Sequence, residues 1–203
     1  MTRIFLAVVA VTLVTAGCNG SGGGEGSGGG EKAGAKAVTG SFVGNVDGTD
    51  AYVGIVVARD GDVFGYATDG VTNPDHLDGA LGRRRDDSAR LGNDGGAVLE
   101  AAFEGSTVTG TYTRPGYEPW TFTAERAKAP AGLYRDEQTF DDGLYVGGWI
   151  VLPDGTQRGA VRRYETPLAP GEVDATTFSP GDDTFTVPGG VLRPRRVTPS
   201  SDF

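Results

Sequence analysis

Short runs of alternating apolar and polar residues, separated by turn residues, constrain the fold of this chain more than any other feature. Residues 50–58 and 62–67 alternate in this way around Asp60-Gly61, a dipeptide that favours a tight hairpin turn. Comparable runs occupy residues 97–104, 107–113, 120–125, 144–152, 157–163, 184–187 and 191–197. No window of ten or more residues carries an apolar stripe with the helical period. The sequence therefore predicts an all-β fold, an antiparallel meander closing into a barrel or a sandwich of about ten to twelve short strands.

Two of the predicted hairpins resemble each other. Tyr52-Val53-Gly54 precedes the turn at Asp60-Gly61, and Tyr145-Val146-Gly147 precedes a similar turn at Asp154-Gly155. The echo is compatible with a duplicated hairpin at equivalent places in one closed sheet. It is equally compatible with the residue preferences that all β-hairpins share.

The first residues of the chain have the pattern of an export signal. Arg3 is followed by a largely apolar run of thirteen residues at 4–16, which ends in the small residue Ala16 and is followed by Gly17. A helix that spans a membrane needs about 20 apolar residues, so this run is too short. We therefore expect residues 1–17 to be a signal peptide that is removed on export.

The end of this segment, Thr15-Ala16-Gly17-Cys18, resembles the lipobox of bacterial lipoproteins. The resemblance implies cleavage before Cys18 and a diacylglyceryl group, with palmitate-type acyl chains, on the Cys18 sulfur. It also implies attachment to the cell membrane on its extracytoplasmic face. Thr15 departs from the Leu that is usual at the first lipobox position. The alternative is an ordinary secretory signal with an incidental cysteine.

The composition changes twice after the signal. Residues 19–37 contain nine glycines among nineteen residues and no large apolar side chain, so they cannot bury enough surface to offset the entropy of ordering. We expect residues 18–37 to form the lipidated cysteine and a flexible tether, and residues 38–203 to form one globular β-domain. After the predicted signal peptide, aromatic and β-branched residues appear only from Val38 onward.

The counts of charged and metal-binding residues exclude several classes of protein. With 18 Lys and Arg against 27 Asp and Glu, the net charge is −9, which argues against a nucleic-acid partner. The single cysteine excludes an internal disulfide and any cysteine-based zinc or iron–sulfur site. We expect no cofactor.

A second resemblance covers most of residues 40–197. Residues 131–135 and 145–160, with residues 122–127 just before them, resemble a domain of exported actinobacterial proteins. That family has no assigned activity. The resemblance therefore implies an exported location and a β-rich fold, and it implies no catalytic residue.

Candidate site residues are few. His76, the only histidine, follows the turn residues Asn73-Pro74-Asp75, which favours a solvent-facing position over a catalytic or metal-binding one. The acidic turns do not match a calcium-binding loop, so we assign no metal ligand and no catalytic residue. Tyr117 and Trp120, in a loop rich in Pro and Gly, are the candidate binding residues. The alternative for Trp120 is a place in the core, which is also expected for Trp149.

These observations favour a lipid-anchored extracytoplasmic β-domain without enzymatic activity, acting in binding or in scaffolding of the cell envelope. Its partners would be the membrane, through Cys18, and a cell-wall glycan or a protein. One alternative is an envelope hydrolase, which requires two acids or His76 in one cleft. Another is a barrel that carries a small ligand, which requires small side chains inside.

Overall fold

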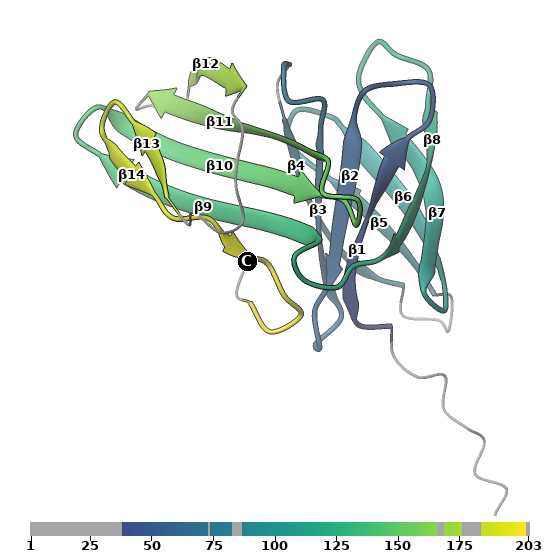
Figure 1. Ribbon diagram of the computed structural model, residues 1–203. Helices are drawn as coiled ribbons and strands as arrows, with labels where there is room; N and C mark the ends of the chain where they lie inside the picture. The colour runs from purple at the N-terminus through teal and green to yellow at the C-terminus, as the bar shows by residue number, and fades with distance from the viewer. Residues whose placement is uncertain (1–37, 73, 83–86, 166–168, 176–183, 202–203) are drawn as a thin grey trace, which may run out of the picture. The chain divides into compact units, whose positions relative to one another are not determined.

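The computed structural model describes residues 38–72, 74–82, 87–165, 169–175 and 184–201, without the side chains of 165 and 169–175. The predicted signal peptide, Cys18 and the predicted tether lie outside the described residues. The all-β prediction is confirmed, and the barrel is the form found: eight antiparallel strands close on themselves by pairing β1 with β8 (Figure 1). These strands are β1 (Gly40–Val46), β2 (Tyr52–Val57), β3 (Asp62–Thr68), β4 (Asp75–Leu81), β5 (Ser88–Gly92), β6 (Val98–Glu104), β7 (Thr107–Thr113) and β8 (Trp120–Arg126).

Large apolar side chains fill the interior of the barrel. Phe42 and Phe103 meet edge to face with ring centroids 5.7 Å apart, and Phe122 is also fully buried. A side chain at Gly110 would collide with the Glu100 carbonyl oxygen on the neighbouring strand, so only glycine allows the two strands to approach this closely. The barrel is therefore a packed core.

A second sheet follows the barrel in the chain. Its strands are β9 (Gly132–Phe140), β10 (Gly143–Val151), β11 (Gln157–Glu165), β12 (Ala169–Ala175) and β15 (Arg195–Arg196), in the order β12-β11-β10-β9-β15. A separate hairpin consists of β13 (Phe185–Val187) and β14 (Gly190–Leu192). The fifteen strands of the described residues exceed the expected ten to twelve. Alternating runs were not recognised at β1, β4, β5, β9 and β12, and the run at residues 191–197 divides between β14 and β15.

Both faces of the second sheet are covered. On one face, Leu133 and Ile150 pack against Val56 and Tyr66 from the outer wall of the barrel. On the opposite face, Trp149 is fully buried with residues of β13 and β14, as expected for a core tryptophan. Alternation along β10 supplies both clusters, because successive side chains point to opposite faces.

One sequence interpretation is wrong. His76 does not lie in a solvent-facing turn: it belongs to β4 and pairs with Tyr66 of β3, and both of its ring nitrogens are buried. Of the two alternatives for the similar hairpins, equivalent places in one closed sheet are excluded, because Tyr52 lies in the barrel and Tyr145 in the second sheet.

The up-and-down order of the barrel places alternate connections at opposite ends. The connections β1–β2, β3–β4, β5–β6 and β7–β8 meet at one end, which we call the mouth. Gly40, where β1 begins, lies at the other end. No helix among the described residues has the length and apolar character needed to cross a membrane.

Candidate functional site

A cleft of about 770 Å³ lies at the mouth of the barrel. Three barrel connections and the beginning of β11 contribute to it. We call it the mouth cleft, and its lining residues are Val46, Thr49, Asp50, Ala51, Ala67, Thr68, Asp69, Gly70, Val71, Thr72, Tyr112, Arg114, Tyr117, Trp120, Gln157, Arg158 and Gly159. Its size is within the range of small-molecule sites.

Three aromatic rings form a continuous series on one wall of the cleft. Tyr112, buried in the barrel core, stacks on Trp120 with centroids 5.9 Å apart. Trp120 in turn contacts Tyr117 at 5.3 Å, and Tyr117 is 61% exposed. The core end of the series holds the rings in place, while its outer end offers an apolar face to solvent.

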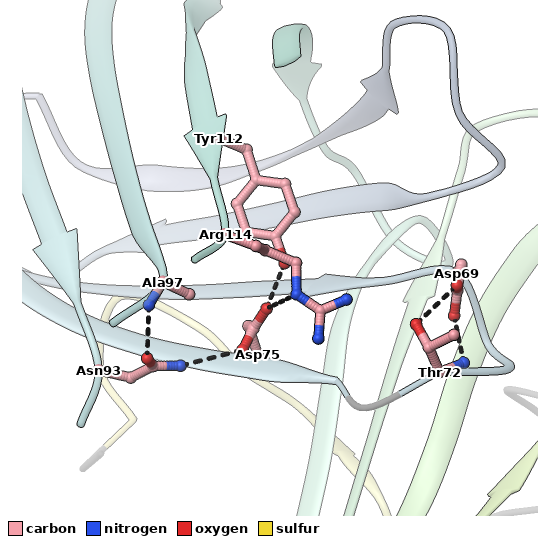
Figure 2. A network of polar contacts seen from close by, with 7 residues as sticks. All are labelled: Asp69, Thr72, Asp75, Asn93, Ala97, Tyr112 and Arg114. Atoms are coloured by element: carbon pink, nitrogen blue, oxygen red, sulfur yellow. Dashed lines mark hydrogen bonds and ion pairs between the residues drawn. The ribbon is translucent and has the colours of Figure 1, made fainter. Parts of the chain in front are cut away.

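A partly buried carboxylate, Asp75, connects residues beside the cleft and contacts two residues of its lining, Tyr112 and Arg114 (Figure 2). Asp75 accepts a short hydrogen bond from the Tyr112 hydroxyl and pairs with Nε of Arg114 at 3.2 Å. Its other oxygen accepts from the side-chain amide of Asn93 at 3.1 Å, and Asn93 also accepts from the backbone of Ala97. Burial, and then the charge of Asp75, raise the pKa of Tyr112, so this phenol stays protonated. Asp75 thus links β4, β7 and the β5–β6 turn.

The β3–β4 loop forms the opposite wall. Asp69 accepts hydrogen bonds from the backbone of Val71 at 2.8 Å and of Thr72 at 2.7 Å, and from the Thr72 hydroxyl at 2.7 Å (Figure 2). Burial alone would raise the pKa of Asp69, but these bonds outweigh it and hold the pKa below its usual range. The loop is therefore fixed by its own carboxylate, and it leaves Val71 72% exposed at the rim.

The second sheet supplies the remaining wall. The Arg158 guanidinium lies over the Tyr52 ring, 5.2 Å from its centroid, and the Tyr52 hydroxyl donates to Thr156 at 3.2 Å. Gln157 places a buried side-chain oxygen in the cleft lining, with no hydrogen-bond partner in the described part of the chain. A buried polar atom of this kind often marks the place of a bound water.

The carboxylates at the cleft differ in how they are held. Asp69 and the neighbouring Asp75 both accept several hydrogen bonds, whereas Asp50 is an exposed residue of the lining. His76 points away from the barrel interior, because its neighbour Leu77 is part of the core. Within the described ranges, no three His, Cys, Asp or Glu side chains are placed to hold a metal ion.

The structure brings the two predicted binding residues, Tyr117 and Trp120, into contact at this cleft. Trp120 lines the cleft and also packs against the core. Sequence reasoning missed Asp75 and Arg114. Only a turn pattern marked Asp75, and residues this far apart in the chain meet only after the barrel closes.

Comparison with known proteins found no matching family model, no matching curated protein and no matching solved structure. The resemblances to bacterial lipoproteins and to exported actinobacterial proteins therefore rest on the sequence alone. The function has to be argued from the geometry of the cleft.

Proposed function

We propose that the chain is a lipid-anchored, non-enzymatic binding module on the extracytoplasmic face of the cell membrane, and that its mouth cleft binds a glycan of the cell envelope. The series Tyr112–Trp120–Tyr117 carries this proposal. Sugar rings have apolar faces that stack on aromatic side chains, and hydroxyl groups at their edges that need hydrogen-bond partners. The cleft offers both kinds of contact.

The exposed apolar side chains support the mouth cleft as the binding site. The described residues contain three large apolar side chains that are well exposed: Val71, Tyr117 and Val191. Two of these, Val71 and Tyr117, stand on opposite walls of the mouth cleft. Exposed apolar side chains gathered at a concave surface are typical of a binding site.

The two alternatives receive less support. A carrier would need space inside the barrel, but Phe42, Phe103 and Phe122 occupy the interior. A hydrolase would need an acid and a base free to act, but Asp69 and the neighbouring Asp75 accept hydrogen bonds from other groups, which leaves Asp50 as the remaining carboxylate of the described lining. The attachment through Cys18 rests on the lipobox resemblance. The diacylglyceryl group that this resemblance implies would supply the two acyl chains that stable anchoring requires.

Tryptophan fluorescence tests the cleft. Purified protein would be titrated with soluble peptidoglycan fragments and, separately, with oligosaccharides of N-acetylglucosamine. We expect a saturable change for the parent, and binding about fivefold weaker for Tyr117→Ala, because one stacking contact is worth about 1 kcal/mol.

Val191→Ala is the matched control, since Val191 is exposed on β14, outside the lining of the cleft. It should bind like the parent. Absence of saturable binding to either probe would contradict the proposal, as would equal binding by the parent and Tyr117→Ala.

A further inference from the structure

A second polar cluster lies between the outer wall of the barrel and the second sheet, away from the mouth cleft. His76 and Tyr66 are paired on β4 and β3, and their rings contact each other with centroids 4.7 Å apart. The Tyr66 hydroxyl donates to the carbonyl oxygen of Gly148 on β10 at 3.0 Å. This bond fixes the barrel wall against the sheet.

Two arginines flank this point on the sheet. Gly148 pairs with Arg135 of β9, and the adjacent same-face position of β10, Val146, pairs with Arg162 of β11. Arg135 and Arg162 therefore share the sheet face that meets the barrel wall. His76 stands opposite, from the barrel. We call these three side chains the His76 cluster.

The His76 cluster holds most of the unsatisfied polar atoms of the described residues. Five buried side-chain polar atoms there lack a hydrogen-bond partner, and four belong to this cluster: Nδ1 and Nε2 of His76, and the Nε atoms of Arg135 and Arg162. Such atoms are rare in folded proteins because each costs free energy, and they often mark the place of a bound water or ion. Since both Nε atoms are donors, the missing partner is an acceptor.

The charges of the cluster also favour a missing partner that is an acceptor with negative charge. Arg135 pairs with Glu137, and its guanidinium lies 5.8 Å from the centre of the Phe64 ring. Arg162 lies over the Tyr164 ring at 4.6 Å, with no carboxylate partner among the described side chains. Two guanidinium groups and one carboxylate leave an excess of one positive charge.

The described side chains of the neighbouring strands bring no second ion-pair partner to this excess. The register places an apolar residue, Val173 of β12, opposite Arg162. Asp78, two positions beyond His76 on β4, is exposed and makes no ion pair with either arginine in the described structure. Burial, and then the charges of Arg135 and Arg162, lower the pKa of His76 to about 3. His76 is therefore neutral near pH 7 and adds no positive charge to the excess.

We propose that His76, Arg135 and Arg162 form a binding site for a phosphate group, held between the barrel and the second sheet. A phosphate presents more acceptor oxygens than a carboxylate does, and three side chains with donors converge here. Arg135 keeps 31% of its side chain exposed, so the group can enter from solvent as the arginine side chains adjust.

Nuclear magnetic resonance offers a direct test, because His76 is the only histidine and its imidazole signals are unambiguous. The purified protein would be titrated with inorganic phosphate at constant ionic strength, with sodium chloride replaced as phosphate is added. We expect a saturable shift of the His76 signals. Arg162→Gln and Arg135→Gln should each weaken binding at least tenfold.

Arg90→Gln is the matched control, because Arg90 is an exposed arginine on β5 that pairs with Glu100. It should bind phosphate like the parent. Arg162→Lys, which keeps the charge and loses the guanidinium fork, should bind more weakly than the parent and more tightly than Arg162→Gln. Unchanged tryptophan fluorescence would verify the fold of each variant.

A shift that grows linearly without saturation would overturn the proposal. So would equal binding by the parent and a folded Arg162→Gln variant, or by the parent and a folded Arg135→Gln variant. Dimethyl phosphate distinguishes two sources of the same chemistry. Saturable binding of this diester as well indicates a phosphodiester of a polymer or lipid, whereas binding of inorganic phosphate alone indicates the free ion.

Discussion

Replacement of His76 by phenylalanine should remove a specific sensitivity to acid. The imidazole contacts Tyr66 through its ring, and both nitrogens are buried without a partner. Burial, followed by the charges of Arg135 and Arg162, lowers its pKa to about 3, against about 6.5 in an unfolded chain. Below about pH 6.5 the unfolded chain therefore takes up a proton that the folded chain does not, and the folded state loses stability as the pH falls.

The magnitude follows from this difference in proton binding. One proton changes the free energy of unfolding by about 1.4 kcal/mol for each pH unit, so His76 should cost the folded state about 2 kcal/mol between about pH 6.5 and about pH 4.5. The loss continues until the pH reaches the folded pKa near 3. His76→Phe keeps a ring beside Tyr66 and has nothing to protonate, so this part of the pH dependence should vanish.

Urea unfolding followed by tryptophan fluorescence measures the effect, in amine buffers free of phosphate. The difference between the parent and His76→Phe isolates the imidazole, because all carboxylates are common to both proteins. We expect the stabilities of the two proteins to diverge in favour of the variant as the pH is lowered. If both lost the same free energy over this range, the buried neutral state of His76 would be refuted.

Three further predictions concern other parts of the chain. Cys18→Ser should abolish lipid labelling and release the protein from the membrane fraction; normal processing and retention would contradict the anchor. Asp75→Ala should lower the free energy of unfolding by about 2 kcal/mol, measured by urea denaturation, because its three side-chain partners lose a buried acceptor. Gly159→Ala should lower the melting temperature through a clash with Trp149, at a cost of about 1–3 kcal/mol, whereas Gly92→Ala, where an added Cβ would lie 3.6 Å from the Ala97 carbonyl oxygen, should not.

Local patterns predicted the hairpins well. Gly61 and Gly155 adopt positive φ angles of 99° and 86° in the two turns expected from their Asp-Gly dipeptides. The alternation of residues 97–104 and 107–113 corresponds to β6 and β7. In each case the signal lies within a few neighbouring residues, where turn chemistry and side-chain period act directly.

What local patterns could not predict depends on distant pairing. β4 contains Asp75, Asp78 and Gly79, which favour turns, yet it is a strand because β3 and β5 pair with it on both sides. The division into a barrel and a second sheet rests on the pairing of β1 with β8, and no local run carries that information. The same holds for the mouth cleft. A Pro- and Gly-rich loop drew attention to Tyr117, but the meeting of Asp75 with Arg114 requires the closed barrel.

The direction of β1 has a consequence for how the protein would face its surroundings. The strand begins at Gly40, at one end of the barrel, and runs to Val46, which lines the mouth cleft at the other end. The chain that leads from Cys18 therefore joins the barrel at the end away from the cleft. Attachment through Cys18 would then leave the mouth cleft unobstructed by the tether and open to a partner.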